Sequence, residues 1–243
     1  MREKVDIVGI DVDNVTMEES MEALKTFLEG GRLNMIFTPN SEIMIDAVKD
    51  RELGEILNEA QLLIPDGIGL VIASRFYKTP LKEKVAGVEL GTKLIELAEK
   101  EGKSIFLFGG KPGVAEEAAN KLKEKYGDLK IAGTMHGYFA EDEEEAMVDK
   151  INESGADILF AALGAPKQEK FIYRYKDSLK VKIAMGVGGG IDIWAGVAQR
   201  APEFYQKAGL EWLYRFIKEP KRFMRILKLP KFIALAFVDA KTR

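Results

Sequence analysis

Short apolar runs that end in glycine recur three times along this chain, and this recurrence constrains the fold more than any other feature. Runs this short and this apolar are typical of strands buried on both faces of a sheet. Strand–glycine–helix units in series predict an α/β fold with a Rossmann-like parallel sheet, helices on both faces and a nucleotide-sized cleft along one edge. The three runs and their loops are Ser104 to Phe108 with Gly109-Gly110, Asp157 to Leu163 with Gly164, and Val181 to Val187 with Gly188 to Gly190.

Asp66 follows another run of this kind, Leu62 to Ile64. Pro65 ends the strand, and Gly67 lets the backbone turn sharply. Taken alone, an aspartate at such a position is more often a turn residue that bonds its own backbone. Ligands of open α/β sheets collect beyond the carboxyl ends of the strands, so Asp66 is also a candidate catalytic residue. A second polar cluster, Thr38 to Ser41, follows the run Leu33 to Phe37 in the same way.

The loop Gly109 to Gly113 opens a predicted helix over Val114 to Tyr126. Backbone N–H groups and the positive end of a helix dipole suit a phosphate group. The loop is neither a P-loop nor a complete dinucleotide fingerprint, and many such loops only turn the chain. By itself it is weak evidence for a nucleotide.

A metal site is not expected. Asp11-Val12-Asp13 resembles the Asp-x-Asp motif of one class of sugar transferases, but no second carboxylate cluster pairs with it. His136 is the only histidine and there is no cysteine, so a zinc site is also not expected. We interpret His136 as structural.

Two local predictions concern the first third of the chain. The residues Val5 to Val12 are expected to form one strand, and Ser41 to Asn58 one helix.

The 243 residues suit one large α/β domain with an appendage, which we divide into a core over 1–198 and a tail over 199–243. The tail holds 11 Lys and Arg against 4 Asp and Glu, a net charge of +7, whereas the core carries −10. This asymmetry predicts an anionic partner for the tail, either nucleic acid or a membrane surface. The charged N-terminus does not resemble a signal peptide, which together with the lack of cysteine favours a cytoplasmic protein.

The apolar part of the tail, Leu229 to Val238, is too short to span a bilayer. It suits an interfacial membrane helix, and it equally suits a helix packed on its own domain or on another subunit. The sequence leaves these alternatives open, and with them a homo-oligomer.

An ordered set of motifs resembles the WecG/TagA/CpsF glycosyltransferases over essentially the whole chain, most closely the N-acetylmannosaminyltransferases of wall teichoic acid synthesis. The motifs are Thr38-Pro39-Asn40, Pro65-Asp66-Gly67-Ile68-Gly69, Phe108-Gly109-Gly110, Gly137-Tyr138-Phe139, Gly164-Ala165-Pro166-Lys167-Gln168-Glu169, Gly186-Val187-Gly188-Gly189, Arg200-Ala201-Pro202 and Gly209-Leu210-Glu211-Trp212-Leu213.

The resemblance implies transfer of N-acetylmannosamine from UDP-N-acetylmannosamine (UDP-ManNAc) to undecaprenyl-diphosphate-linked N-acetylglucosamine (GlcNAc). It further implies a β-1,4 linkage formed with inversion, no required metal or other cofactor, and a tail that completes the site and reaches the inner face of the membrane. Asp66 then removes the proton from the acceptor hydroxyl.

The remaining site residues are chosen from their places in the sequence, which agree with that chemistry. Thr38, Asn40 and Gln168 orient the sugars. The nucleotide-sugar site is expected to contain Gly109, Gly110, Tyr138, Gly164, Pro166, Lys167, Glu169, Gly188, Gly189 and Asp192. The diphosphate or the lipid phosphates are assigned to the tail arginines Arg215, Arg222 and Arg225.

Two other classes compete with this interpretation. A soluble dinucleotide-dependent oxidoreductase needs a full fingerprint followed by an acidic ribose ligand, which no loop here supplies. A non-catalytic nucleotide-binding module that uses its tail on RNA needs a nucleic-acid motif, and none is recognisable, so no nucleic acid partner is expected.

Overall fold

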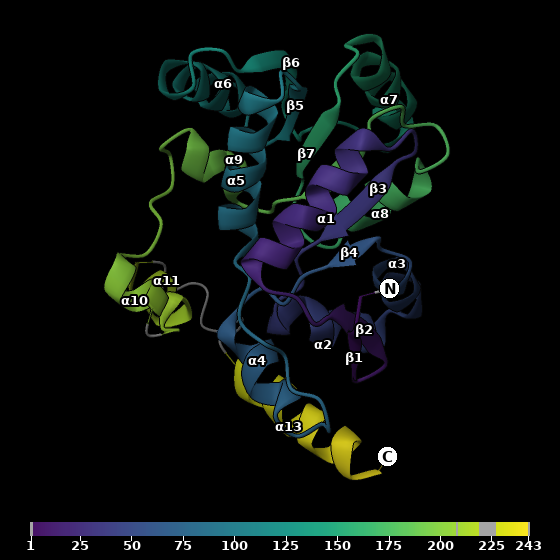
Figure 1. Cartoon of the computed structure of the whole chain (residues 1–243), viewed down its shortest axis with the longest axis vertical. Helices are drawn as coiled ribbons and strands as arrows, with labels where there is room; N and C mark the ends of the chain where they lie inside the picture. Colours follow the sequence, from purple (N-terminus) through teal and green to yellow (C-terminus); the bar gives the residue numbers. More distant parts are fainter. Residues whose placement is uncertain (1, 208, 219–226, 243) are drawn as a thin grey trace.

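A computed structural model of the chain describes residues 2–207, 209–218 and 227–242 (Figure 1). Its centre is a six-stranded parallel sheet with the strand order β4-β3-β8-β7-β5-β6. The prediction of a Rossmann-like parallel sheet is therefore confirmed. The strands are β3 (Asn34–Phe37), β4 (Leu62–Leu63), β5 (Ser104–Gly109), β6 (Lys130–Met135), β7 (Ile158–Ala162) and β8 (Ile183–Gly186).

Helices cover both faces of this sheet, as the sequence predicted. One core cluster joins α1, α5, α6 and α9 to one face, and a second joins α2, α3, α7 and α8 to the other. Successive strand residues alternate between the clusters: Ile105 and Leu107 belong to the first, Phe106 and Phe108 to the second. The helices are α1 (Met17–Glu29), α2 (Ser41–Lys49), α3 (Arg51–Asn58), α5 (Gly87–Lys100), α6 (Val114–Lys125), α7 (Glu144–Glu153), α8 (Lys167–Arg174) and α9 (Gly190–Trp194).

The prediction of one strand over Val5 to Val12 is wrong. The segment forms an antiparallel hairpin of β1 (Lys4–Ile7) and β2 (Ile10–Asp13), separate from the six-stranded sheet. Val8 and Gly9 both have positive φ, 52° and 86°, which is the geometry of a tight two-residue hairpin turn. Of the two turn residues, only Gly9 is of a type that favours turns, so the sequence pattern did not reveal the hairpin.

The Asp-x-Asp motif lies in this hairpin and has a structural role. Asp13 is fully buried, pairs with the Arg2 Nε at 3.0 Å, and accepts the Leu63 N–H at 2.8 Å. It therefore ties β2 to β4. Within the part of the chain that the structure describes, no group of three or more His, Cys, Asp or Glu could hold a metal ion.

The predicted helix over Ser41 to Asn58 is two helices, α2 and α3, that meet at Asp50. Asp50 leaves the helical conformation, with φ −106° and ψ 97°, and its Oδ1 accepts the Leu53 N–H at 3.2 Å. An aspartate that caps a following helix in this way ends the one before it.

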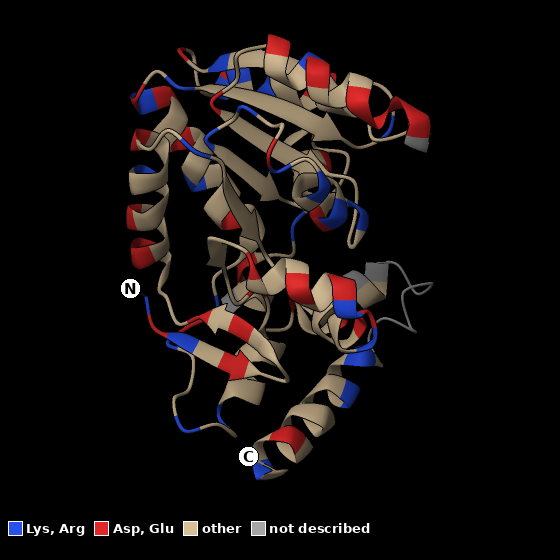
Figure 2. Cartoon of the chain, turned by 90° about the vertical axis from the view of Figure 1, so that its right-hand side faces the viewer, with Lys and Arg blue, Asp and Glu red and all other residues tan. Residues whose placement is uncertain are grey.

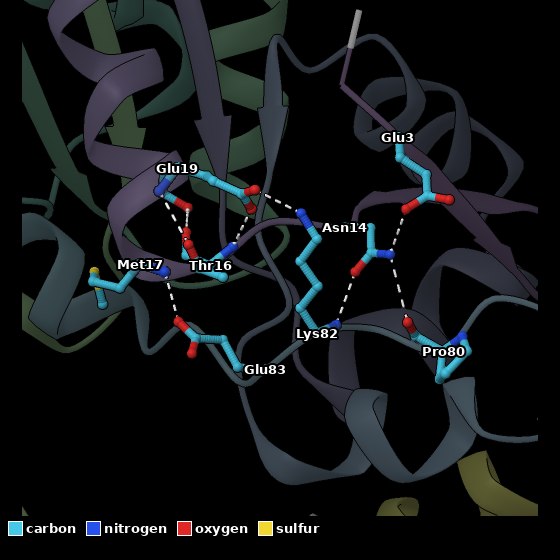
Figure 3. A network of polar contacts seen from close by, with 9 residues as sticks. Glu3, Asn14, Thr16, Met17, Glu19, Pro80, Lys82 and Glu83 are labelled. Atoms are coloured by element: carbon cyan, nitrogen blue, oxygen red, sulfur yellow. Dashed lines mark hydrogen bonds and ion pairs between the residues drawn. The ribbon is translucent and has the colours of Figure 1, made fainter.

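The charged connection between α4 (Ile68–Ser74) and α5 is held against the start of α1 (Figure 3). The Lys82 N–H donates to Asn14 Oδ1 at 2.8 Å, and the Lys82 ammonium donates to Glu19 Oε1 at 2.6 Å. Glu83 accepts the Met17 N–H at 2.6 Å. This connection leads directly to Lys84 and so positions one side of the site described below.

The described part of the tail contains the helices α10 (Glu203–Lys207), α11 (Glu211–Lys218) and α13 (Lys228–Thr242). The last of these lies against α2 and α4 and fully buries Phe232 and Ala236. It carries several lysines along an otherwise mostly uncharged ribbon (Figure 2). In the described residues, no helix has the length and apolar character needed to cross a membrane. The segment thus packs on its own domain, which is one of the alternatives that the sequence left open for it.

Candidate active site

A cavity of about 970 Å³ lies beyond the carboxyl ends of the parallel strands. The loops after β3, β4, β5, β7 and β8 form one wall, and α11 and α13 contribute to the other. Such an edge of an open α/β sheet is where ligands bind. Eleven residues that the sequence predicted for the site line it: Thr38, Asn40, Asp66, Gly110, Tyr138, Gly164, Lys167, Gln168, Gly188, Gly189 and Asp192.

Asp66 is half-buried at the end of the loop after β4. Its backbone N–H donates to the carbonyl groups of Pro39, at 3.2 Å, and Ile64, at 3.0 Å. Gly67 then takes φ +91°, which lets the chain turn into α4 directly after the aspartate. The backbone of Asp66 is thus fixed to the neighbouring strand end.

Thr38 and Asn40 lie on the adjoining loop after β3. Thr38 is only 8% exposed and donates to the Gly186 carbonyl at 3.4 Å. Asn40 caps α2, because its Oδ1 accepts the N–H groups of Glu42 at 2.9 Å and Ile43 at 3.2 Å. Since the carbonyl oxygen is used as the cap, the amide nitrogen is the part of Asn40 suited to a ligand.

Gln168 joins α8 to the loop after β8. Its Oε1 accepts the Gly188 N–H at 3.1 Å, and its Nε2 donates to Glu169 Oε1 at 2.9 Å. Both residues are buried, with exposed fractions of 2% for Gln168 and 1% for Glu169. Burial raises the pKa of Glu169, and the hydrogen bond from Gln168 offsets part of that rise.

The glycine loops shape the cavity wall, but two of their backbone N–H groups already donate hydrogen bonds within the protein. The Gly110 N–H donates to the Ala162 carbonyl at 3.2 Å, and the Gly188 N–H is used by Gln168. A Cβ on Gly109 would lie 2.3 Å from the Ala162 carbonyl oxygen, so only glycine lets β5 and β7 approach there. Because these two N–H groups are engaged, cationic side chains must carry more of the binding of an anion.

Among the described residues, the lysines that line the cavity are Lys84, Lys111 and Lys167. Lys84 pairs with Glu211 of α11 at 2.8 Å, and the Lys167 ammonium lies 3.8 Å from the centroid of the Phe139 ring. Lys111 faces Asp192: burial raises the pKa of Asp192, and the charge of Lys111 lowers it in part. These three ammonium groups come from two loops and from the first residue of α8. They share the described lining with five carboxylates, those of Glu42, Asp46, Asp66, Asp192 and Glu211.

The structure does not bring every predicted residue to the cavity. Gly109, Pro166 and Glu169 are absent from the lining of the described residues. Arg215 lies on α11, but its side chain is outside the described part of the structure, and Arg222 and Arg225 lie outside the described residues.

Sequence reasoning also missed lining residues. These are chiefly Ser41, Glu42, Asp46, Lys84, Lys111, Trp212, Phe216 and Leu229. Lys111 stands inside the glycine loop and could have been found there. Lys84 has no comparable signal, because the loop that carries it is placed by contacts with α1.

A parallel sheet whose carboxyl ends open into a cavity with a carboxylate, amides and lysines is the architecture of a Rossmann-like glycosyltransferase. The chain belongs to the glycosyl transferase WecG/TagA/CpsF family, which it matches over residues 5–243. The family resemblance seen in the sequence is thereby confirmed, and neither the oxidoreductase nor the non-catalytic module is favoured.

Two relatives illustrate the similarity. A protein of Staphylococcus aureus (strain MRSA252) is 35% identical over 232 residues, which cover 95% of this chain and 91% of the relative. A protein of Bacillus spizizenii is 36% identical over 208 residues, covering 86% of this chain and 80% of the relative. Both are named N-acetylglucosaminyldiphosphoundecaprenol N-acetyl-beta-D-mannosaminyltransferase.

Proposed function

We propose that this chain transfers N-acetylmannosamine from UDP-ManNAc to undecaprenyl-diphosphate-linked GlcNAc, forming a β-1,4 linkage in the linkage unit of wall teichoic acid. The names of the two relatives support the acceptor and the transferred sugar. The observation that carries the proposal is that Asp66, Thr38, Asn40 and Gln168 line one cavity at the carboxyl ends of the strands.

Asp66 is the general base of the proposed reaction. Its carboxylate takes the proton of the acceptor hydroxyl while the hydroxyl oxygen bonds to the anomeric carbon of the donor sugar. The bond from that carbon to the UDP oxygen breaks on the opposite face, so the configuration inverts and UDP leaves with the electron pair. Thr38, Gln168 and the amide nitrogen of Asn40 orient the sugars for this attack.

The departing UDP gains negative charge, which the site must stabilise. In the proposed mechanism Lys84, Lys111 and Lys167 do so, since all three line the cavity. Tyr138, Asp192 and the glycine loops form the rest of the nucleotide-sugar site. The tail arginines Arg215, Arg222 and Arg225 remain predicted ligands of the diphosphate or the lipid phosphates.

The acceptor approaches from the side of the tail, residues 199–243, which we propose as an appendage to the core over 1–198. Trp212, Phe216 and Leu229 give that side of the cavity an apolar wall, which suits a lipid-linked substrate. The tail also exposes large apolar side chains beside its net charge of +7: Phe204, Ile217, Phe237 and Val238. These features support a peripheral protein at the cytoplasmic face of an anionic membrane.

The release of UDP tests this proposal. The protein is incubated with a short-chain lipid-diphosphate GlcNAc acceptor and either UDP-ManNAc or UDP-GlcNAc, and free UDP is measured over time. We expect release only with UDP-ManNAc and only when the acceptor is present. Equal release without the acceptor, or with UDP-GlcNAc, would contradict the assigned reaction.

A further inference from the structure

Glu169 is a buried acid that the proposed reaction does not use. It is 1% exposed and is not part of the cavity lining in the described residues. Its Oε1 accepts the Gln168 amide, whereas its Oε2 is buried without a hydrogen-bond partner among the described residues. A carboxyl group in such a place costs stability, because burial removes its water without a full set of new bonds.

The bond from Gln168 to Glu169 fixes the orientation of the Gln168 amide. The Gly188 N–H can only donate, so the amide oxygen must face it. The Glu169 Oε1 accepts from the other end of the amide, so the NH2 group must face it. A flipped amide would put two donors together at Gly188 and two oxygens together at Glu169.

This arrangement leaves one hydrogen of the Gln168 NH2 group for a ligand. Gln168 lines the cavity, while Glu169 behind it does not. Glu169 therefore acts on the cavity through its neighbour. Gly186 has no side chain, and a Cβ there would lie 2.8 Å from the Gln168 Nε2, so glycine at this position leaves room for the amide.

We propose that Glu169 is a positioning residue that holds the Gln168 amide with its remaining N–H directed to the donor sugar or its diphosphate. The proposal rests on the proposed function for the identity of that ligand. It assigns Glu169, which the sequence placed in the nucleotide-sugar site, to the support of that site. The apparent cost of a buried acid with a partnerless oxygen then has a functional reason.

Two substitutions separate this role from a purely structural one. Glu169→Gln keeps an oxygen that can accept from Gln168, and Glu169→Met keeps the length of the side chain but removes the acceptor. Glu144→Gln is the matched control: Glu144 is also buried, and it accepts from Arg174 of α8 at 2.7 Å, away from the cavity lining. The kcat and KM for UDP-ManNAc and the Tm are measured for each variant.

We expect Glu169→Met to lower kcat/KM about tenfold, the effect of losing about 1.4 kcal/mol from one hydrogen bond to a group that binds the transition state. Its Tm should stay the same or rise, because the costly buried acid is gone. Glu169→Gln should stay within about threefold of the wild type, and Glu144→Gln should leave kcat/KM unchanged. In a Gln168→Ala background, Glu169→Met should cause no further loss.

The proposal is overturned if Glu169→Met has normal kinetics. It is also overturned if the loss of kcat/KM in Glu169→Met accompanies a fall in Tm and is still seen in the Gln168→Ala background. A second readout does not depend on the reaction. The side-chain amide signal of Gln168 in a 15N NMR spectrum should exchange slowly with water in the wild type and Glu169→Gln, and quickly in Glu169→Met. If UDP-ManNAc is not a substrate, the proposed function fails, and this signal still decides the role of Glu169.

Discussion

The Lys228 ammonium lies 2.8 Å from the Asp46 carboxylate, and this contact fastens the start of α13 to α2 at the rim of the cavity. Glu42 lies 3.6 Å from the same ammonium, and both acids line the cavity together with Leu229. The contact makes the start of α13 part of the cavity wall, which is independent of the membrane attachment proposed for the tail.

Lys228→Ala should therefore loosen α13. A partly buried pair of this kind contributes about 1 kcal/mol, so we expect hydrogen exchange in α13 to accelerate about fivefold and turnover on a soluble acceptor to fall several-fold. Lys231→Ala is the control, because Lys231 is exposed on the same helix. Equal turnover in the two variants would show that the contact does not shape the site.

Asp66→Asn should lower kcat about 10²- to 10⁴-fold, because the amide cannot take the proton of the acceptor hydroxyl. Binding of UDP, measured by calorimetry, should change little. Asp11→Asn serves as the control, since Asp11 is an exposed acid in the hairpin. Near-normal turnover of Asp66→Asn would remove this residue from the mechanism.

Turnover should survive an excess of EDTA, because the proposed site stabilises the leaving diphosphate with lysines. The initial rate of UDP release is compared before and after dialysis against the chelator. A loss of rate that added Mg²⁺ or Mn²⁺ restores would contradict this prediction.

Glu169 should make stability depend on pH. Burial raises its pKa above the ordinary 4.5, so in the pH range just above that value the folded state holds a proton that the unfolded state has released. The contribution of Glu169 to the free energy of unfolding is therefore fully present below pH 4.5 and is lost as the pH rises through its folded pKa. The free energy of unfolding of the wild type and of Glu169→Gln is measured by urea unfolding at a series of pH values from 4.5 upward. If the difference in free energy between the two proteins does not change with pH, the prediction is refuted.

Gly109→Ala should destabilise the fold by about 3 kcal/mol or more. Its φ is +143°, and the added Cβ would meet the Ala162 carbonyl oxygen at 2.3 Å. Gly113→Ala is the control: φ is +86° but no atom lies within 4 Å, so only backbone strain of about 1 kcal/mol is expected. The urea unfolding midpoints of the two variants report their losses of stability. Similar midpoints would mean that β5 and β7 can move apart with little loss of stability.

The sequence predicts the sheet well, because the inner strands β3, β5, β7 and β8 are almost entirely buried and end in polar or glycine-rich loops. Asp66, Thr38 and Asn40 could be predicted as neighbours since the carboxyl ends of parallel strands share one edge. The order of the strands carries no such local signal, and neither does the cavity wall formed by Trp212 and Leu229, which depends on how distant helices pack.

Errors arose where one residue decides between two structures. The Val8-Gly9 turn converts an apparently continuous strand into a hairpin, and the Asp50 cap divides one amphipathic stretch into two helices. Glu169 differs for another reason: Lys167 and Gln168 beside it in the motif line the cavity, whereas its own side chain is buried and is not part of that lining in the described residues.

Glu19 shows how far from a site its determinants can lie. One of its oxygens accepts the Thr16 N–H and completes the cap of α1, while the other holds Lys82 two residues before Lys84. A single surface acid thus sets both where a helix begins and where a cavity lysine is anchored. Substitution of Glu19 would thus change the placement of a cavity lysine, although Glu19 is not among the residues of the cavity.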